Sequence, residues 1–254
     1  MLRLRQLALV ADQLDPVLDN LQNVFGLQVA FNDPGVKTYG LKNAVIPVNS
    51  QFVEVVSPIQ ENTAAGRYLV RRKGDGGYMV ILQCDDHPAR KARVDEMGIR
   101  KVEEHDTKDY SIMQLHPQDT GGSFLEIDVQ VGGEDMNGPW MPAGKEWQKA
   151  RTERMSGIAA AEIQSPQPEV VADRWGKLLD IGPQPDENGN PTISLDNATI
   201  RFVPAEDGRG EGLAGIDLIA ADRDAVMAEA DKRGLVSEDG TISICGIRFT
   251  VVDG

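Results

Sequence analysis

The chain has few of the residues that usually carry redox, metal or aromatic chemistry. Its 254 residues include two cysteines, three histidines and 5% aromatic side chains. Cys84 and Cys245 lie among apolar, strand-like residues without CxxC spacing, so buried, reduced thiols are expected. His87 opens a predicted helix and His105 lies in an acidic segment. Only His116 therefore remains as a candidate functional histidine.

Basic residues and long apolar runs are also scarce. Lys and Arg number 26 against 40 Asp and Glu, for a formal charge of −14, and phosphate binding requires clustered basic residues. The N-terminal apolar run meets Asp12 before it could form a signal sequence, and no later segment approaches a membrane span. We therefore expect a cytoplasmic protein with a small-molecule ligand and with no nucleic-acid or membrane partner.

The chain does contain a repeated order of predicted elements. The alternating run RQLALVA predicts a strand, apolar residues from Leu14 to Phe25 recur at helical spacing, and three strand-like runs follow in QVAFND, LKNAVIPV and QFVEVVSP. The same order returns in GYMVILQCDD, HPARKARVDEMGI, RKVEEHD, YSIMQLHP and GSFLEIDVQ. The repetition predicts two consecutive βαβββ modules.

Two less regular copies follow in the second half of the chain. They can be traced through MSGIAAAEIQS and PEVVADRWGKLLDI, and through GLAGIDLIAAD and RDAVMAEADKRGLV. A segment rich in Gly, Pro and charge separates the halves. We predict an α+β protein with an N-terminal pair of modules in residues 1–130, a connector in 131–156 and a C-terminal pair in 157–254. Trp140 and Trp147 of the connector are expected to fill the seam between the halves.

These features resemble the vicinal oxygen chelate superfamily, which includes glyoxalase I, methylmalonyl-CoA epimerase, extradiol dioxygenases and bleomycin-resistance proteins. The resemblance is best over residues 4–130, in RQLALVADQLD, GYMVILQCDD and GLKNAVIPVNSQFVEVVSP. The run HPQDTGGSFLEID looks like the closing hairpin of methylmalonyl-CoA epimerases. The resemblance implies that the four βαβββ modules pair into two cup-shaped domains of mixed sheet.

In that superfamily, metal ligands come from the first and last strands of each module. The matching positions here are Gln6, Glu54, Met79 and Glu126. An amide oxygen and two carboxylates suit a divalent ion such as Ni, Co, Mn, Zn or Fe, but a thioether is a poor ligand for such ions. Catalytic relatives usually have histidine where this chain has Gln6 and Met79, which disfavours a dioxygenase. A one-residue bulge that turns Tyr78 inward is an alternative to Met79.

Glu126 and Glu54 are the candidate catalytic residues. Glu126 lies between Leu125 and Ile127 and must point to the opposite face of its strand from both. An ordinary outward glutamate is the simpler alternative. The resemblance instead implies that both acids face into the cup, as ligand, base or both.

Four further residues are candidate substrate contacts. His116 precedes a turn proline, either as a surface histidine or as a contact at the rim of the cup. Arg67 lies on a predicted helix that joins the first two modules, where it could anchor an anionic tail or remain solvated. Arg201 and Arg248 occupy the C-terminal positions that match Glu54 and Glu126. They could clamp a carboxylate or phosphate, or pair with acids of the protein.

Two functions remain open from the sequence. The first is a lyase or isomerase that forms an enolate of a small carbonyl or carboxylate metabolite, with a divalent metal if Glu54 and Glu126 hold one. The alternative is a metal-free protein that binds or sequesters a small molecule without catalysis. The C-terminal pair of modules could also be purely structural. The identity of the substrate lies beyond the sequence, and a homodimer is compatible with this class of fold.

Overall fold

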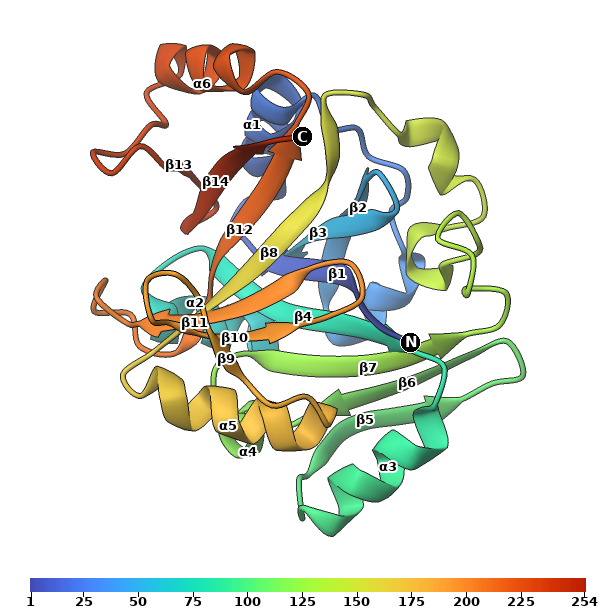
Figure 1. Cartoon of the computed structure of the whole chain (residues 1–254). Coiled ribbons are helices and arrows are strands. Elements are labelled where there is room, and N and C mark those ends of the chain that lie inside the picture. The colour runs from blue at the N-terminus through green and yellow to red at the C-terminus, as the bar shows by residue number, and fades with distance from the viewer.

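The computed structural model describes all residues 1–254 and contains two seven-stranded mixed sheets with helices packed around them (Figure 1). The N-terminal sheet has the strand order β2-β3-β1-β4-β7-β6-β5, and the C-terminal sheet has the order β13-β14-β12-β8-β11-β10-β9. Each sheet is formed by two consecutive modules whose first strands, β1 and β4 or β8 and β12, pair antiparallel at its centre. The expected α+β fold class is confirmed.

The N-terminal sheet and its helices occupy the first half of the chain. Its strands are β1 (Leu2–Val10), β2 (Leu41–Val48), β3 (Gln51–Pro58), β4 (Gly76–Cys84), β5 (Lys101–Asp106), β6 (Tyr110–Leu115) and β7 (Phe124–Gln130). Its helices are α1 (Leu14–Phe25), η1 (Pro34–Tyr39), α2 (Ala64–Arg72), α3 (His87–Glu96) and α4 (Pro117–Thr120).

A connector with two short helical turns leads to the second sheet. The turns are η2 (Met141–Ala143) and η3 (Trp147–Ala150). The strands that follow are β8 (Met155–Ser165), β9 (Gln184–Pro185), β10 (Pro191–Ser194), β11 (Thr199–Pro204), β12 (Gly212–Ala220), β13 (Ile242–Ile244) and β14 (Ile247–Asp253). The helices of this half are α5 (Pro168–Leu179) and α6 (Arg223–Lys232), and no helix of the protein is both long and apolar enough to cross a bilayer.

The first module has one strand fewer than expected, and the fourth is the shortened copy that its sequence indicates. The run QVAFND does not form a strand; only Phe31 makes an isolated bridge, with Val45 of β2. Val236 makes the equivalent bridge with Ile242 in the fourth module. The two inner modules contribute four strands each and the two outer modules three, so each sheet has seven strands. The outer modules end their sheets early because polar and turn-forming residues follow each bridge.

The two sheets share one hydrophobic core on the faces that carry the helices. The core contains the leucines and valines of β1, β3, β4 and β7 together with apolar residues of β8, β11, β12 and β14. The ring of Phe25 on α1 packs 5.0 Å from that of Phe249 on β14. Strand β4 crosses closest to β12 at Gly77, where a Cβ atom would overlap the backbone oxygen of Leu213. The opposite face of each sheet, which is concave, is therefore turned away from the shared core.

Candidate functional site

The concave face of the N-terminal sheet contains the residues that the sequence singled out. Along β1, Leu7 and Leu9 point into the shared core, so the alternation of side chains turns Gln6 to the other face. On β3, Val53 and Val55 point into the core, which turns Glu54 to the concave face in the same way.

The second module repeats this arrangement. On β7, Leu125 and Ile127 lie in the core, so Glu126 between them faces the cup. Because β1 lies between β3 and β4, and β4 pairs with β7, Glu54 and Glu126 approach the same central region from opposite sides. The structure thus brings Glu54, Glu126 and Gln6 together.

A bulge on β4 changes the face to which its side chains point. Ala8 pairs with Met79 but the next residue, Leu9, pairs with Gly77, so Tyr78 is the extra residue. As a result, the buried Tyr78 and the half-buried Met79 both face the cup, whereas from the sequence we expected only one of them to do so. Burial raises the pKa of Tyr78 to about 12, so its hydroxyl is neutral at pH 7.

Glu54 is held by two neutral amide groups. Asn43 on β2 donates from Nδ2 to Oε1 of Glu54 over 2.6 Å, and Gln6 donates from Nε2 to Oε2 over 2.8 Å. The amide oxygen of Gln6 in turn accepts a 2.8 Å hydrogen bond from the indole nitrogen of Trp140. Burial raises the pKa of Glu54, and the two amide donors offset this rise in part.

Glu126 has a comparable environment with a different set of partners. Gln114 on β6 donates from Nε2 to Oε2 of Glu126 over 3.0 Å, and the same nitrogen lies 3.4 Å from the sulfur of Met79. Burial raises the pKa of Glu126 to about 7; hydrogen bonds with Asp128 and Gln114 oppose the rise, while the charge of Glu54 adds to it. Glu126 can therefore gain or lose a proton near neutral pH.

Two aromatic layers enclose these carboxyl groups. On one side, α2 covers the cup, with Tyr68 packed edge-on at 5.0 Å against Tyr78, which lies 5.1 Å from Phe124. On the other side, the connector fills the cup with Trp140 and Trp147, which pack on Phe52, Ile81 and Tyr110. The carboxyl groups consequently lie in a polar layer between two apolar ones, and Glu54 and Glu126 are only 9% and 8% exposed.

The position of the two tryptophans corrects an expectation from the sequence. They do not fill the seam between the halves but pack into the concave face of the N-terminal sheet. The buried guanidinium of Arg5 holds them there, at 5.3 Å from the ring centre of Trp140 and 5.7 Å from that of Trp147. Arg5 faces the cup because a bulge on β1 places it beside Gln6.

The cup is closed on a third side by contact between its two outer edges. Strands β2 and β5 lie at opposite ends of the sheet. The sheet curls so far that the hydroxyl of Tyr39, just before β2, donates a 2.6 Å hydrogen bond to Glu103 on β5. Burial, together with this hydrogen bond and the charges of Glu103 and Glu126, raises the pKa of Tyr39 to about 12.

His116 and Arg67 lie outside the polar layer. The ring of His116 caps the short helix α4, where its Nδ1 accepts a 3.2 Å hydrogen bond from the backbone of Gln118. Arg67 is exposed on α2 and donates to the backbone oxygen of Asn62 over 2.6 Å. Arg67 therefore lies on the outside of the helix that covers one end of the cup, whereas His116 has a structural partner.

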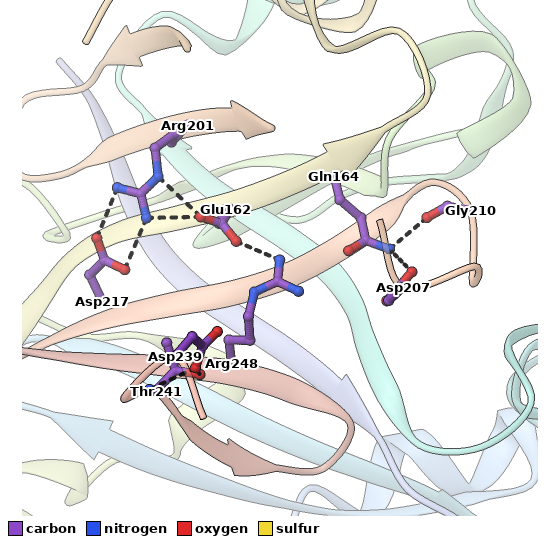
Figure 2. A network of polar contacts seen from close by, with 9 residues as sticks. All are labelled: Glu162, Gln164, Arg201, Asp207, Gly210, Asp217, Asp239, Thr241 and Arg248. Atoms are coloured by element: carbon purple, nitrogen blue, oxygen red, sulfur yellow. Dashed lines mark hydrogen bonds and ion pairs between the residues drawn. The ribbon is translucent and has the colours of Figure 1, made fainter. Parts of the chain in front are cut away.

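Arg201 and Arg248 face the concave side of the C-terminal sheet, but acids already hold them (Figure 2). Arg201 on β11 lies between Glu162 on β8 and Asp217 on β12, with nitrogen–oxygen distances of 3.0 to 3.1 Å. Arg248 on β14 donates to the second oxygen of Glu162 over 2.6 Å.

This network disfavours an anion clamp in the C-terminal cup. Glu162, Arg201 and Asp217 line a polar cavity of about 660 Å³, together with the acidic turn between β9 and β10. Both guanidinium groups thus pair with carboxylates of their own half of the chain. An anion could replace these carboxylates only if ion pairs were broken in a cavity that carries more acids than bases.

The residues of the N-terminal cup do not fit a divalent metal ion. The amide oxygen of Gln6 already accepts from Trp140, and both oxygens of Glu54 accept from amide groups. Met79 offers only a thioether, which such ions bind poorly. Nowhere in the protein do three His, Cys, Asp or Glu side chains gather around one potential metal position. The chemistry of this site is therefore derived from its side chains alone.

Four polar residues of this site were missed in the sequence. Asp128 stands two residues after Glu126 on a strand, a spacing that places both side chains on one face. This signal was readable from the sequence. Asn43, Gln114 and Tyr39 gave no such signal. Asn43 and Gln114 become partners of Glu54 and Glu126 through the pairing of neighbouring strands, and Tyr39 meets Glu103 only when the sheet curls.

The four modules form two pairs, each with its concave face turned away from the shared core. In the first pair, Glu54 and Glu126 lie on equivalent strands. This arrangement defines a vicinal oxygen chelate protein. The sequence profile of the glyoxalase-like domain matches residues 7–179, more than half of the chain. The protein belongs to this glyoxalase-like family. No curated protein matches the sequence.

One solved structure agrees with this fold over the whole chain, and others are similar to part of it. A hypothetical protein from Staphylococcus aureus superposes over 100% of both chains with a TM-score of 0.69 and 15% identity. A methylmalonyl-CoA epimerase from Streptomyces coelicolor, in complex with 2-nitronate-propionyl-CoA, matches 50% of this chain and 96% of its own, with 20% identity and a TM-score of 0.45. The methylmalonyl-CoA epimerase from Mycobacterium tuberculosis matches 56% of this chain and 91% of its own, with 19% identity and a TM-score of 0.45. At these identities the likeness concerns the fold alone.

Proposed function

We propose that the protein is an isomerase that moves a proton at the carbon next to a carbonyl group, with Glu126 as the base. The observation that carries this proposal is the pair of buried carboxyl groups, Glu126 and Glu54, on one concave face. Burial raises the pKa of both, that of Glu126 to about 7. A base with a pKa near the working pH is ionised often enough to accept a proton and basic enough to remove one.

The proposed reaction uses the two carboxyl groups in turn. The carboxylate of Glu126 takes the proton from the substrate carbon, and the electron pair of the broken C–H bond moves to the carbonyl oxygen to form an enolate. Glu54, whose pKa is raised by burial, returns a proton to the carbon from the other side. Glu126 then releases its proton to solvent and Glu54 takes one up, so the atoms and charges balance.

Neutral hydrogen-bond donors hold both carboxyl groups without neutralising them. Asn43 and Gln6 orient Glu54, and Gln114 orients Glu126. An amide fixes the direction of an oxygen but brings no opposing positive charge, so the basicity of the carboxylate is retained. The aromatic layers on either side limit the access of water to these groups.

The charge of the cup favours an uncharged carbonyl over a free carboxylate as the reacting group. The charges of Glu54 and Glu126 each disfavour a further negative charge in the polar layer. An anionic tail could instead lie against α2, where Arg67 is exposed and Arg71 stacks 5.1 Å from the ring centre of Tyr68. We therefore favour a small ketone, aldehyde or thioester, and an isomerase over a lyase.

Solvent exchange tests this proposal without knowledge of the substrate. We would incubate the protein in D2O with a panel of hydroxyketones, 2-oxo acids and acyl thioesters and follow the loss of the α-proton signal by ¹H NMR. Glu126→Gln should lower the exchange rate by about 10² or more, as expected for loss of a general base. Glu238→Gln, an exposed acid far along the chain, is the matched control. Equal exchange by wild type and Glu126→Gln would refute the proposal.

A metal-free binding protein is the second candidate, and one observation favours it. Each carboxyl oxygen of Glu54 already has a donor, and aromatic side chains pack above and below, as in a site that holds a ligand without turning it over. The same panel separates the two functions. A ligand that shifts the NMR signals of the protein but whose α-proton does not exchange would support binding alone.

A further inference from the structure

Asp128 is a buried acid that the proposed reaction does not use. It lies at the end of β7 with an exposed fraction of 0%. The hydroxyl of Tyr110 on β6 donates to its Oδ2. Its other oxygen, Oδ1, is buried and has no hydrogen-bond donor. A buried carboxylate oxygen without a donor is costly, whereas a protonated one becomes a donor itself.

The position of Asp128 on the strand supplies an acceptor for that proton. Asp128 and Glu126 are two residues apart on β7, so both side chains project from the concave face. The two carboxyl groups interact, and the interaction raises the pKa of Asp128 while it lowers that of Glu126. This is the pattern expected if Asp128 donates and Glu126 accepts.

The surroundings determine which of the two acids holds the proton. The charges acting on the pair come from Glu54 on β3 and Glu103 on β5, and both disfavour a second negative charge. Tyr110 faces Asp128 from β6, and Cys84 lies near it on β4. Of the two acids, Asp128 is the more deeply buried, while Glu126 retains 8% exposure and the donor of Gln114. The negative charge is therefore best placed on Glu126.

We propose that Asp128, positioned by Tyr110, holds a proton in an acid pair with Glu126, so that the pair carries one negative charge and Glu126 is the member that reacts. Asp128 is thus a positioning residue: it donates to Glu126 and holds the carboxylate toward the cup. The catalytic consequence rests on the proposed function, but the shared proton does not. It can be measured in the protein without any substrate.

The first measurement follows the carboxyl carbons of the wild-type protein labelled with ¹³C in Asp and Glu. We expect the Asp128 carbon to keep the chemical shift of a protonated acid throughout the pH range in which the Glu126 carbon titrates, near neutral pH. Glu126→Gln and Asp128→Asn assign the two signals. If Asp128 instead deprotonates with a midpoint below neutral pH, the proposal is wrong.

The second measurement uses the sign of a shift in the variants. In Asp128→Asn the amide still donates to Glu126 and no charge is lost, so the midpoint of Glu126 should stay within about half a unit of the wild-type value. If Asp128 were ionised, the same substitution would remove a negative charge and lower the midpoint by about one unit or more. Asp128→Ala removes the donor and should raise the midpoint.

The activity of the same variants separates this proposal from the proposed function. A shared proton in the NMR titration, together with proton exchange that does not need Glu126, would uphold the acid pair and refute the isomerase. Proton exchange that depends on Glu126, together with an ionised Asp128, would support the isomerase and refute the acid pair. If both hold, Asp128→Ala should move the pH profile of exchange to higher pH in step with the Glu126 midpoint, a change that a purely structural role would not produce.

Discussion

Replacement of Glu126 by glutamine should change how the stability of the protein depends on pH. In the folded protein, burial raises the pKa of Glu126 from its ordinary value of 4.5 to about 7. The folded state therefore binds a proton more tightly than the unfolded state does. The stability that this group contributes is complete below the unfolded pKa and is lost as the pH rises toward the folded pKa.

The size of the effect follows from the difference between the two pKa values. One unit corresponds to about 1.4 kcal/mol, so a rise from 4.5 to about 7 makes Glu126 cost about 3 kcal/mol at pH 8 relative to pH 4. Glutamine has nearly the same shape and no charge at any pH, so it lacks this cost. The variant should gain about 3 kcal/mol relative to the wild type between these two pH values.

Urea unfolding at a series of pH values from 4 to 8 measures this difference, with the fluorescence of Trp140, Trp147 and Trp175 as the signal. The pH dependence of acids that do not interact with Glu126 cancels when the wild-type and variant curves are subtracted. Glu238→Gln, at an exposed turn, should give a flat difference. A flat difference for Glu126→Gln as well would show that Glu126 ionises in the folded state as it does in water, and would remove the basis of the proposed reaction.

Two further substitutions test the packing of the molecule. Gly77→Ala should lower the free energy of unfolding by about 1–3 kcal/mol, because its Cβ would overlap the backbone of β12 at Leu213. Gly182→Ala is the control and should change the stability little, because the space around Gly182 is open. Equal urea midpoints for the two variants would contradict the close contact between β4 and β12. Arg201→Ala should cost about 2 kcal/mol or more, because it leaves Asp217 without a partner and Glu162 with Arg248 alone. Lys149→Ala, which breaks an exposed pair with Glu146, should cost less than about 1 kcal/mol. Similar losses in thermal unfolding would show that the C-terminal network is solvated.

The fold could be predicted because it depends on patterns that are local in the sequence. The alternation in β1 and β3 and the helical spacing in α1 each appear within one element, and their return in the second module fixed the pairing of modules. The first module was predicted with one strand too many. Nothing local in QVAFND distinguishes an isolated bridge at Phe31 from a short strand. The difference depends on how many residues of this segment pair with β2, which is a property of the folded sheet.

The candidate site could be predicted only in part, because its partners come from distant segments. Glu54, Glu126 and Gln6 follow from strand alternation and from the repeat. The contact of Trp140 with Gln6 joins the connector to the first strand, and no periodicity reports it. The bulge that turns both Tyr78 and Met79 inward depends on how β4 pairs with β1, which is a property of the sheet and not of the strand.

The two cups differ in the partners that their acids have, and this difference decides where chemistry can occur. In the C-terminal cup, Glu162 and Asp217 are paired with the guanidinium groups of Arg201 and Arg248, so their charge is neutralised and their oxygens are occupied. In the N-terminal cup, the donors that hold Glu54 and Glu126 are neutral amides and no guanidinium pairs with either acid, so each remains costly to ionise in a buried layer. A guanidinium stabilises a carboxylate and lowers its basicity, whereas an amide mainly orients it. The duplicated scaffold therefore presents acids twice, but only in its first half are they free of guanidinium partners, as the proposed function requires of a base.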